Sequence, residues 1–225
     1  MVLAFIFLGC QVNPESTRTV YREREDGWFQ FYTNDPSRHG TVFREVVGRR
    51  APEPIITTPT FETTIFEIEV KKVSGNRLQG FGMIFGQVNN YRHFFININV
   101  DGQYAIGRRN LASTNPVPGA DNLVDQAIPG RALAVSWIDS PRLNRGFNRS
   151  NIIRVERTGT AYTVFLNGHE VDTFTDGFIS NADMNSQGHR IGFRASVGTA
   201  AQQAFPNTPV DVRFRIRTLP PPSDP

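Results

Sequence analysis

Apolar and polar residues alternate along much of the chain between residues 61 and 217, as in β-strands with one buried and one solvated face. Within residues 66–71, for example, three large apolar side chains alternate with Glu, Glu and Lys. This alternation, or in one case a continuous apolar run, predicts strands at 61–73, 81–86, 91–100, 103–109, 132–137, 151–157, 161–167, 170–174, 190–197 and 210–217. Helical periodicity is weak, and a short helical turn is expected only at 179–184.

Turn signals separate the predicted strands. Residues 74–76 (Ser-Gly-Asn) predict a turn, while Asp-Gly at 101–102 and Asn-Gly at 167–168 favour β-hairpins. The segment 110–130 is rich in Pro, Asn and Asp, which predicts a long surface loop. Many short strands joined by such turns are typical of a sandwich or barrel. We therefore expect an all-β fold, a two-sheet antiparallel β-sandwich.

The N-terminal residues differ from this region. Residues 1–9 form an apolar leader that resembles the end of a secretory signal peptide and is too short to span a bilayer. Cys10, the single cysteine, follows Leu8 and Gly9 as in a bacterial lipobox, although Phe7 replaces the usual Leu and no basic residues precede the run. We expect an exported protein held at the cell envelope or surface by lipid on Cys10. The alternative is a buried apolar strand with an ordinary thiol.

The remaining boundaries follow from composition. Residues 10–27 are polar and of mixed charge, which predicts a tether, and the Pro-rich residues 220–225 cannot continue a strand ladder and predict a tail. The chain of 225 residues contains 18 Phe and 19 Gly, which suits one β domain with many tight turns. We therefore expect a single sandwich domain at residues 28–219.

Charge bears on the partners. The net charge is +3, and the arginines are spread along the chain rather than gathered into the basic patch typical of nucleic-acid binding. In residues 213–217 three arginines alternate with Phe and Ile, so they are expected to line one face of a strand. We expect no nucleic-acid partner, and contact with a membrane only through a lipid anchor.

The order of the motifs carries a family resemblance. A Gly-rich apolar strand (GFGMIFG) precedes a Tyr- and Phe-rich strand with an Asp-Gly hairpin (YRHFFININVDGQYAIGRR). An Asn-anchored strand, a Gly turn and an Asn-Gly hairpin follow (SNIIRVERTGTAYTVFLNGHEV), and then an Ile-Gly strand (HRIGFRASVG). Over residues 61–217 this order resembles the concanavalin A-like lectin/glucanase and laminin-G-like superfamily, especially bacterial exported proteins with such a domain. The resemblance implies a jelly roll whose concave sheet and rim loops often hold sugars.

Hydrolases of this superfamily carry a Glu-x-Asp-x-x-Glu strand, and retaining chemistry needs two carboxyl groups about 5–5.5 Å apart. The nearest match is Glu67-Ile68-Glu69, and a lysine replaces the third acid. These two glutamates also fit a solvated strand face. The chain has no Gly-x-Ser-x-Gly motif, and its cysteine directly follows the leader. We therefore assign no catalytic residue.

Metal ligation has little support in the sequence. The four histidines are scattered, with no His-x-His spacing. Residues 183–188 resemble a calcium loop, but Arg194 stands where the bidentate Glu would be. We expect a plain polar turn and no cofactor. A rim Ca²⁺ site, as laminin-G-like domains often carry, remains the alternative.

Sugar binding needs aromatic planes and planar polar groups. Residues 91–99 place both kinds on one face of a strand, the partner strand adds two residues, and a tryptophan precedes an Arg- and Asn-rich loop. The candidate ligand-binding residues are Tyr91, His93, Asn97, Asn99, Tyr104, Arg108 and Trp137. Alternatively, Phe95 and Trp137 belong to the core, and Asn97 and Asn99 merely face solvent.

These observations favour a non-catalytic binding module that recognises carbohydrate or a cell-surface protein. One alternative is a polysaccharide hydrolase or lyase that acts through atypical residues. Another is a structural surface protein that assembles through its sheet edges or its arginine-rich last strand.

Overall fold

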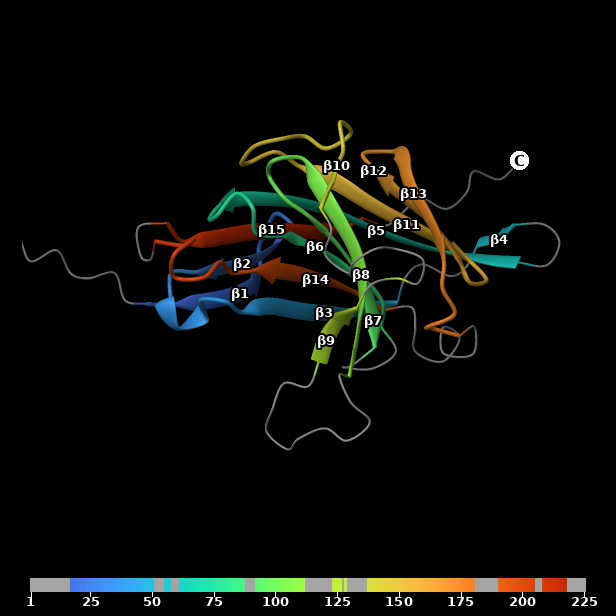
Figure 1. The fold of residues 1–225 in the computed structure, drawn as a ribbon, viewed down its shortest axis with the longest axis horizontal. Helices are drawn as coiled ribbons and strands as arrows, with labels where there is room; N and C mark the ends of the chain where they lie inside the picture. Colours follow the sequence, from blue (N-terminus) through green and yellow to red (C-terminus); the bar gives the residue numbers. More distant parts are fainter. Residues whose placement is uncertain are drawn as a thin grey trace, which may run out of the picture.

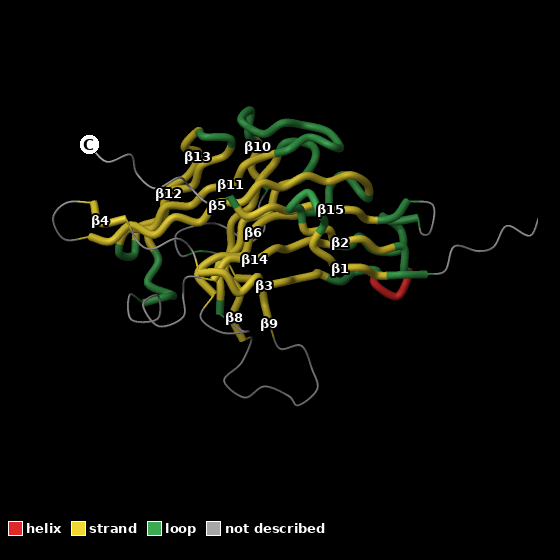
Figure 2. Tube along the Cα trace, turned by 180° about the vertical axis from the view of Figure 1, so that it is seen from behind, coloured by secondary structure: helices red, strands yellow, loops and turns green. Residues whose placement is uncertain are grey.

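The computed structural model describes residues 17–50, 55–57, 61–87, 92–111, 123–126, 128, 137–180, 190–204 and 208–217. Within these ranges the chain folds as a jelly-roll β-sandwich of two antiparallel sheets (Figure 1). Helix is confined there to the short turn η1 (Pro36–Arg38), shown in red in Figure 2. None of the described segments is a helix long and apolar enough to cross a membrane.

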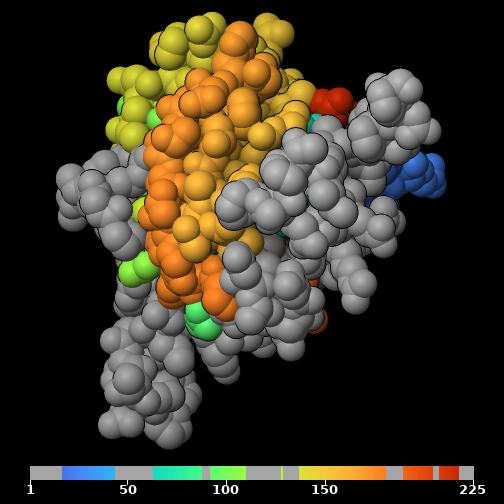
Figure 3. Space-filling model, turned by 90° about the vertical axis from the view of Figure 1, so that its right-hand side faces the viewer, coloured from blue at the N-terminus to red at the C-terminus, as the bar shows by residue number. Residues whose placement is uncertain are grey.

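Sheet A contains both the first and the last strand of the described chain. Its strand order is β1-β2-β15-β5-β11-β12-β13, and β4 pairs with one end of β5. The strands are β1 (Thr19–Glu23), β2 (Phe29–Thr33), β4 (Ile55–Thr57), β5 (Phe61–Ser74), β11 (Asn151–Thr158), β12 (Ala161–Leu166), β13 (His169–Thr175) and β15 (Val210–Ile216). Figure 3 looks onto the orange hairpin β12–β13 at one edge of this sheet.

Sheet B has the order β10-β8-β7-β6-β14-β3, and β9 also pairs with β8. Its strands are β3 (Val42–Arg50), β6 (Phe81–Gln87), β7 (His93–Ile98), β8 (Gln103–Leu111), β9 (Leu123–Gln126), β10 (Ile138–Asp139) and β14 (Arg190–Ser196). Strand β7 pairs with β6, which precedes it in sequence, and with β8, which follows it. The strand predicted as Tyr- and Phe-rich therefore lies in the middle of the sheet.

Aromatic side chains from the two sheets meet in a common core. Phe193 of sheet B stacks on Phe214 of sheet A with ring centroids 4.6 Å apart, and Phe94 contacts Tyr162 across the sandwich at 5.0 Å. Burying each such side chain contributes roughly 1.5–3 kcal/mol. With no disulfide available from a single cysteine, this core carries the stability of the fold.

Most predicted strands are confirmed to within two residues, including β6, β7, β11, β12, β14 and β15. The predicted strand at 132–137 lies outside the described residues except for Trp137, and only residues 179 and 180 of the expected helical turn are described, without helix.

Several strands differ from the sequence predictions. The tether predicted for residues 10–27 contains β1, because Tyr21 packs against Phe29 and Phe43 and the strand pairs with β2. The sandwich therefore includes residues before 28. Strand β3 was not predicted, and β9 lies inside the loop predicted at 110–130. Residues 1–9, Cys10 and 220–225 lie outside the described residues.

Candidate functional site

The outer face of sheet B carries buried polar residues around strand β7. Because successive side chains of a strand point to opposite sides, Phe94 and Ile96 lie in the core while His93, Phe95 and Asn97 lie on the outer face. These three are 2%, 0% and 3% exposed. We call the β7 face the group formed by His93, Phe95 and Asn97 with Ile84 of β6, Arg109 of β8 and Arg194 of β14.

Strand register brings Arg194 onto the β7 face. Asn97 pairs with Gly82 of β6, and Gly82 pairs in turn with Arg194 of β14. A Cβ atom at residue 82 would lie 2.0 Å from the carbonyl oxygen of Ile96, so this close strand approach requires glycine. The Arg194 guanidinium lies over the neighbouring Phe95 ring, with its Cζ 3.9 Å from the ring centroid. Such a cation–π contact holds the guanidinium in a fixed orientation.

Asn97 and Trp137, both predicted from the sequence as ligand-binding residues, lie together. A Cβ atom at Gly80 would be 3.0 Å from Trp137 Cη2 and 3.0 Å from Asn97 Cβ, so the indole and the amide border the same glycine. Trp137 is half-buried. Asn97 Oδ1 is buried, and the described chain offers it no hydrogen-bond partner. An unsatisfied buried carbonyl costs about 1–3 kcal/mol, so this acceptor calls for a functional explanation.

His93 and Arg109 form the other end of the β7 face. They lie directly opposite each other in register, and Arg109 also pairs with Asp125 of β9. Both side chains are buried, at 2% and 5% exposed.

The structure places Tyr104 and Arg108 on the opposite side of the sheet from Asn97. Tyr104 pairs with Ile98 and Arg108 with Phe94, so both face inward. A two-residue turn at 101–102 would have placed them on the β7 face, but the register is shifted by one residue, which reverses every side chain. The interpretation that they share one platform with Asn97 is therefore wrong.

Asn99 accounts for this shift. Its Oδ1 accepts hydrogen bonds from the backbone N–H groups of Asp101 and Gln103, each at 3.1 Å, and its Nδ2 donates to Gln103 Oε1 at 2.9 Å. The side chain thus lengthens and closes the hairpin turn, a common role for Asn. Its ligand-binding role stays a prediction, and Tyr91 lies outside the described residues.

Arg108 belongs to a cluster with Asp176, Phe178 and Arg92 that the sequence did not predict. Its Nη1 lies 3.1 Å from the buried carboxylate of Asp176, and its guanidinium lies over the Phe178 ring. Arg92 also lies over Phe178 and donates to its carbonyl oxygen. No periodic pattern links residues so far apart in the sequence, so only the fold reveals this cluster.

The two glutamates weighed as hydrolase residues lie on sheet A. Glu67 is 3.5 Å from Arg217, and Glu69 is 2.5 Å from Arg215. Burial acts to raise the pKa of Glu69, but hydrogen bonds from Arg215 and Ser150 and the nearby positive charge lower it overall. A carboxyl group held ionised in this way is poorly suited to act as a general acid.

The described residues contain no group of three or more His, Cys, Asp or Glu side chains that could hold a metal ion. The segment that resembles a calcium loop, residues 183–188, lies outside them.

Comparisons with known proteins agree with this architecture. No protein-family model and no curated protein sequence matches the chain. The solved structure of the carbohydrate-binding module CBM66 from Bacillus subtilis is 10% identical, covers 89% of this chain and 92% of its own, and superposes with a TM-score of 0.50. The likeness is one of fold, a jelly roll of two antiparallel sheets.

Two further similar structures are more distant. Alginate lyase A1-II′, a member of polysaccharide lyase family 7, is 11% identical over 88% of this chain and 84% of its own, with a TM-score of 0.39. The protein BuGH16Bwt is 10% identical over 86% and 77%, with a TM-score of 0.40. At such low identity the likeness extends to the fold alone.

Proposed function

We propose that the protein is a non-catalytic module that binds carbohydrate at the β7 face. The observation that supports this most directly is the buried Asn97 Oδ1, which has no hydrogen-bond partner among the described residues and lies beside the Trp137 indole. On binding, a C–H face of the sugar ring would pack on the half-buried indole, and a sugar hydroxyl would donate to the Asn97 oxygen once the residues that bury it move aside. The guanidinium of Arg194, which lies over Phe95, adds positive charge to the same face.

The test is calorimetric titration of the folded protein with a panel of neutral and acidic oligosaccharides. For any sugar that binds, Asn97→Ala and Trp137→Ala should each weaken the affinity about tenfold or more, because each removes a contact worth about 1–3 kcal/mol. Tyr32→Ala, which removes an aromatic side chain from sheet A, is the matched control and should bind normally. If no sugar binds the folded protein, or if both variants bind as the wild type does, the proposal fails.

The same titrations separate binding from catalysis. His93 lies opposite Arg109 on the β7 face, and a histidine beside a guanidinium is suited to proton transfer next to a stabilised anion. Chromatography of each bound sugar after incubation should show intact ligand. If the wild type cleaves a bound sugar and His93→Gln does not, the protein is an atypical lyase or hydrolase rather than a non-catalytic binding module. A cell-surface protein as the ligand is the further alternative, and binding to whole cells after enzymatic removal of glycans would favour it.

The proposal extends to export and anchoring through Cys10. It is supported by the apolar leader and by the sequence Leu8-Gly9-Cys10. Expression of the full chain in a bacterium with a labelled fatty acid should label the wild type but not Cys10→Ser. Equal labelling of the two would exclude lipidation at this residue.

A further inference from the structure

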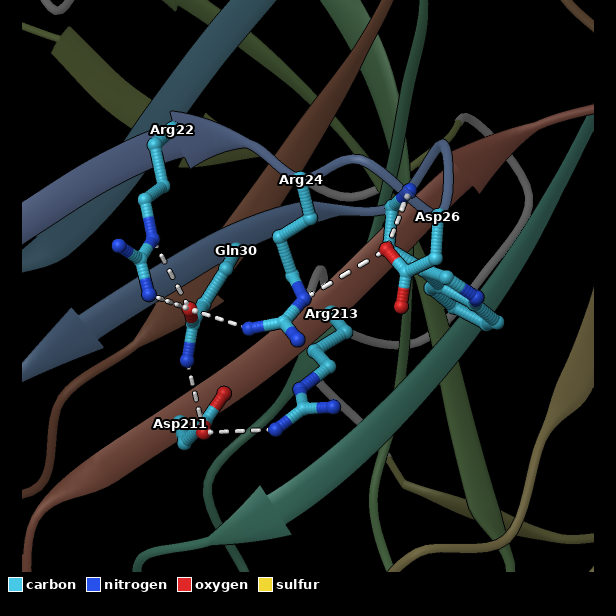
Figure 4. A network of polar contacts seen from close by, with 7 residues as sticks. Arg22, Arg24, Asp26, Gln30, Asp211 and Arg213 are labelled. Atoms are coloured by element: carbon cyan, nitrogen blue, oxygen red, sulfur yellow. Dashed lines mark hydrogen bonds and ion pairs between the residues drawn. The ribbon is translucent and has the colours of Figure 1, made fainter.

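A row of three cations and one glutamine crosses four adjacent strands on the outer face of sheet A. Arg22 of β1 pairs with Gln30 of β2, Gln30 pairs with Arg213 of β15, and Arg213 pairs with Lys71 of β5. Neighbouring strands lie about 4.8 Å apart, so the row extends over about 14 Å. We call these four residues the cation row, and Figure 4 shows the part of it around Gln30.

Charge is not balanced along the cation row. Arg213 and Lys71 are directly opposite, an arrangement of like charges that destabilises a sheet. Asp211 partly offsets this, since its Oδ2 lies 3.4 Å from Arg213 and accepts from Gln30 Nε2 at 2.9 Å. The contacts of Arg22 in the described structure are with the neutral Gln30 Oε1, at 3.3 and 3.4 Å.

The cations are held in place rather than mobile in solvent. Lys71 Nζ lies 4.2 Å from the centroid of the Trp28 ring, and Arg215 Cζ lies over the same ring at 4.8 Å. Arg24, on the same side, donates to Gln30 Oε1 and lies 3.5 Å from Asp26 (Figure 4). A hollow of about 410 Å³ lined by residues 22–26 lies at the β1 end of the cation row.

We propose that the cation row binds a linear acidic polysaccharide, at a site separate from the β7 face. Guanidinium groups recognise carboxylates through paired, charge-assisted hydrogen bonds, and three cations along about 14 Å suit an extended chain with repeated carboxylates. The carboxylate of Asp26, whose side chain is 52% exposed, lies beside Arg24 and can accept hydrogen bonds from sugar hydroxyls.

The same features disfavour other polyanions. Trp28 is only 7% exposed, so it offers no open ring on which a nucleic-acid base could stack. Membrane-surface proteins add exposed apolar side chains to their cations. The exposed large apolar residues in the described chain, Leu78 and Ile138, lie in a loop and in sheet B.

The experiment measures binding of the full-length protein to polygalacturonate, with fully methyl-esterified polygalacturonate as the matched uncharged ligand. The double variant Arg22→Gln/Lys71→Gln should bind polygalacturonate about tenfold or more weakly than the wild type, because it removes two cations of the row. The double variant Arg38→Gln/Arg142→Gln removes the same charge from exposed positions elsewhere and should bind normally. Added salt should weaken wild-type binding.

Three results would overturn the proposal. The first is an equal loss of affinity for polygalacturonate in both double variants, which would mean that only the net charge of the protein matters. The second is equal binding of the esterified polymer. The third is tighter, row-dependent binding to single-stranded DNA or to phosphatidylglycerol vesicles. Circular dichroism checks that each variant is folded. If the double variant Arg22→Gln/Lys71→Gln unfolds, the single variant Arg22→Gln replaces it in the binding measurement. Asn97→Ala should leave polygalacturonate binding at the cation row intact, so failure here is distinguishable from failure of the β7-face proposal.

Discussion

Lys72 is a buried cation whose effect on stability can be measured as a function of pH. It lies at the inner side of β5, 1% exposed, and its Nζ donates to the carbonyl oxygens of Asn76 at 2.5 Å and Gln79 at 3.1 Å. Among the described residues, burial alone and no neighbouring charge shifts its pKa. Burial lowers the pKa of Lys72 from 10.5 to about 7 because desolvation disfavours the charged form.

The sign of the pH dependence follows from this lowered pKa. Between pH 7 and 10.5 the unfolded chain binds a proton at Lys72 that the folded chain releases, so the free energy of unfolding rises with pH. The limiting slope is about 1.4 kcal/mol per pH unit. Because the folded-state site is half protonated at pH 7, the gain from pH 7 to pH 9 is about 2 kcal/mol.

Urea unfolding of the wild type and Lys72→Met at several pH values between 7 and 9 tests this. Subtracting one protein from the other removes the titration of all shared groups. The difference should change by about 2 kcal/mol in favour of the wild type as the pH rises. Lys71→Met, next in sequence but on the outer face, is the control and should keep the wild-type slope. Parallel curves for the wild type and Lys72→Met would refute the reasoning. Methionine also removes two hydrogen bonds, so the slope, not the offset, is decisive.

Two further substitutions test the packing of the sheets. Gly82→Ala would place a Cβ 2.0 Å from the Ile96 carbonyl oxygen, so β6 and β7 must separate, and we expect a loss of about 3 kcal/mol in urea unfolding; a wild-type midpoint would contradict the register. Asn151→Ala removes hydrogen bonds of 2.7 and 3.1 Å with Asn144 from a side chain that is 2% exposed, and thermal unfolding should show a loss of about 1–3 kcal/mol; an unchanged melting temperature would mean that solvent replaces them.

Strands with one apolar and one polar face could be predicted from the sequence, whereas strands at the edges of the sheets could not. Strand β12 was predicted at its observed place because Tyr162, Val164 and Leu166 all point into the core. Strand β1 was missed because it lies at the edge of sheet A, where Arg22 and Glu23 face solvent and mask the alternation. Edge strands carry such charges because these discourage pairing with other chains.

The candidate site was predicted only where one strand determines it. Asn97 lies on the outer face because alternation along β7 is local information. The position of Arg108 depends on the length of the turn after Val100, and the side chain of Asn99 changes that length. A shift of one residue moved Arg108 from the expected outer face to an inward ion pair with Asp176.

The cation row was invisible in the sequence for a topological reason. Arginines spread along the chain indicated no basic patch, yet Gln30 and Asp211, 181 residues apart in sequence, hydrogen-bond at 2.9 Å. Strand β15 lies between β2 and β5 and so brings the last described arginines beside the first. The row therefore exists only when β15 is docked, and any binding at the row should be lost together with that strand. A charge distribution along a sequence thus says little about surface patches when the sheet order joins the two ends of the chain.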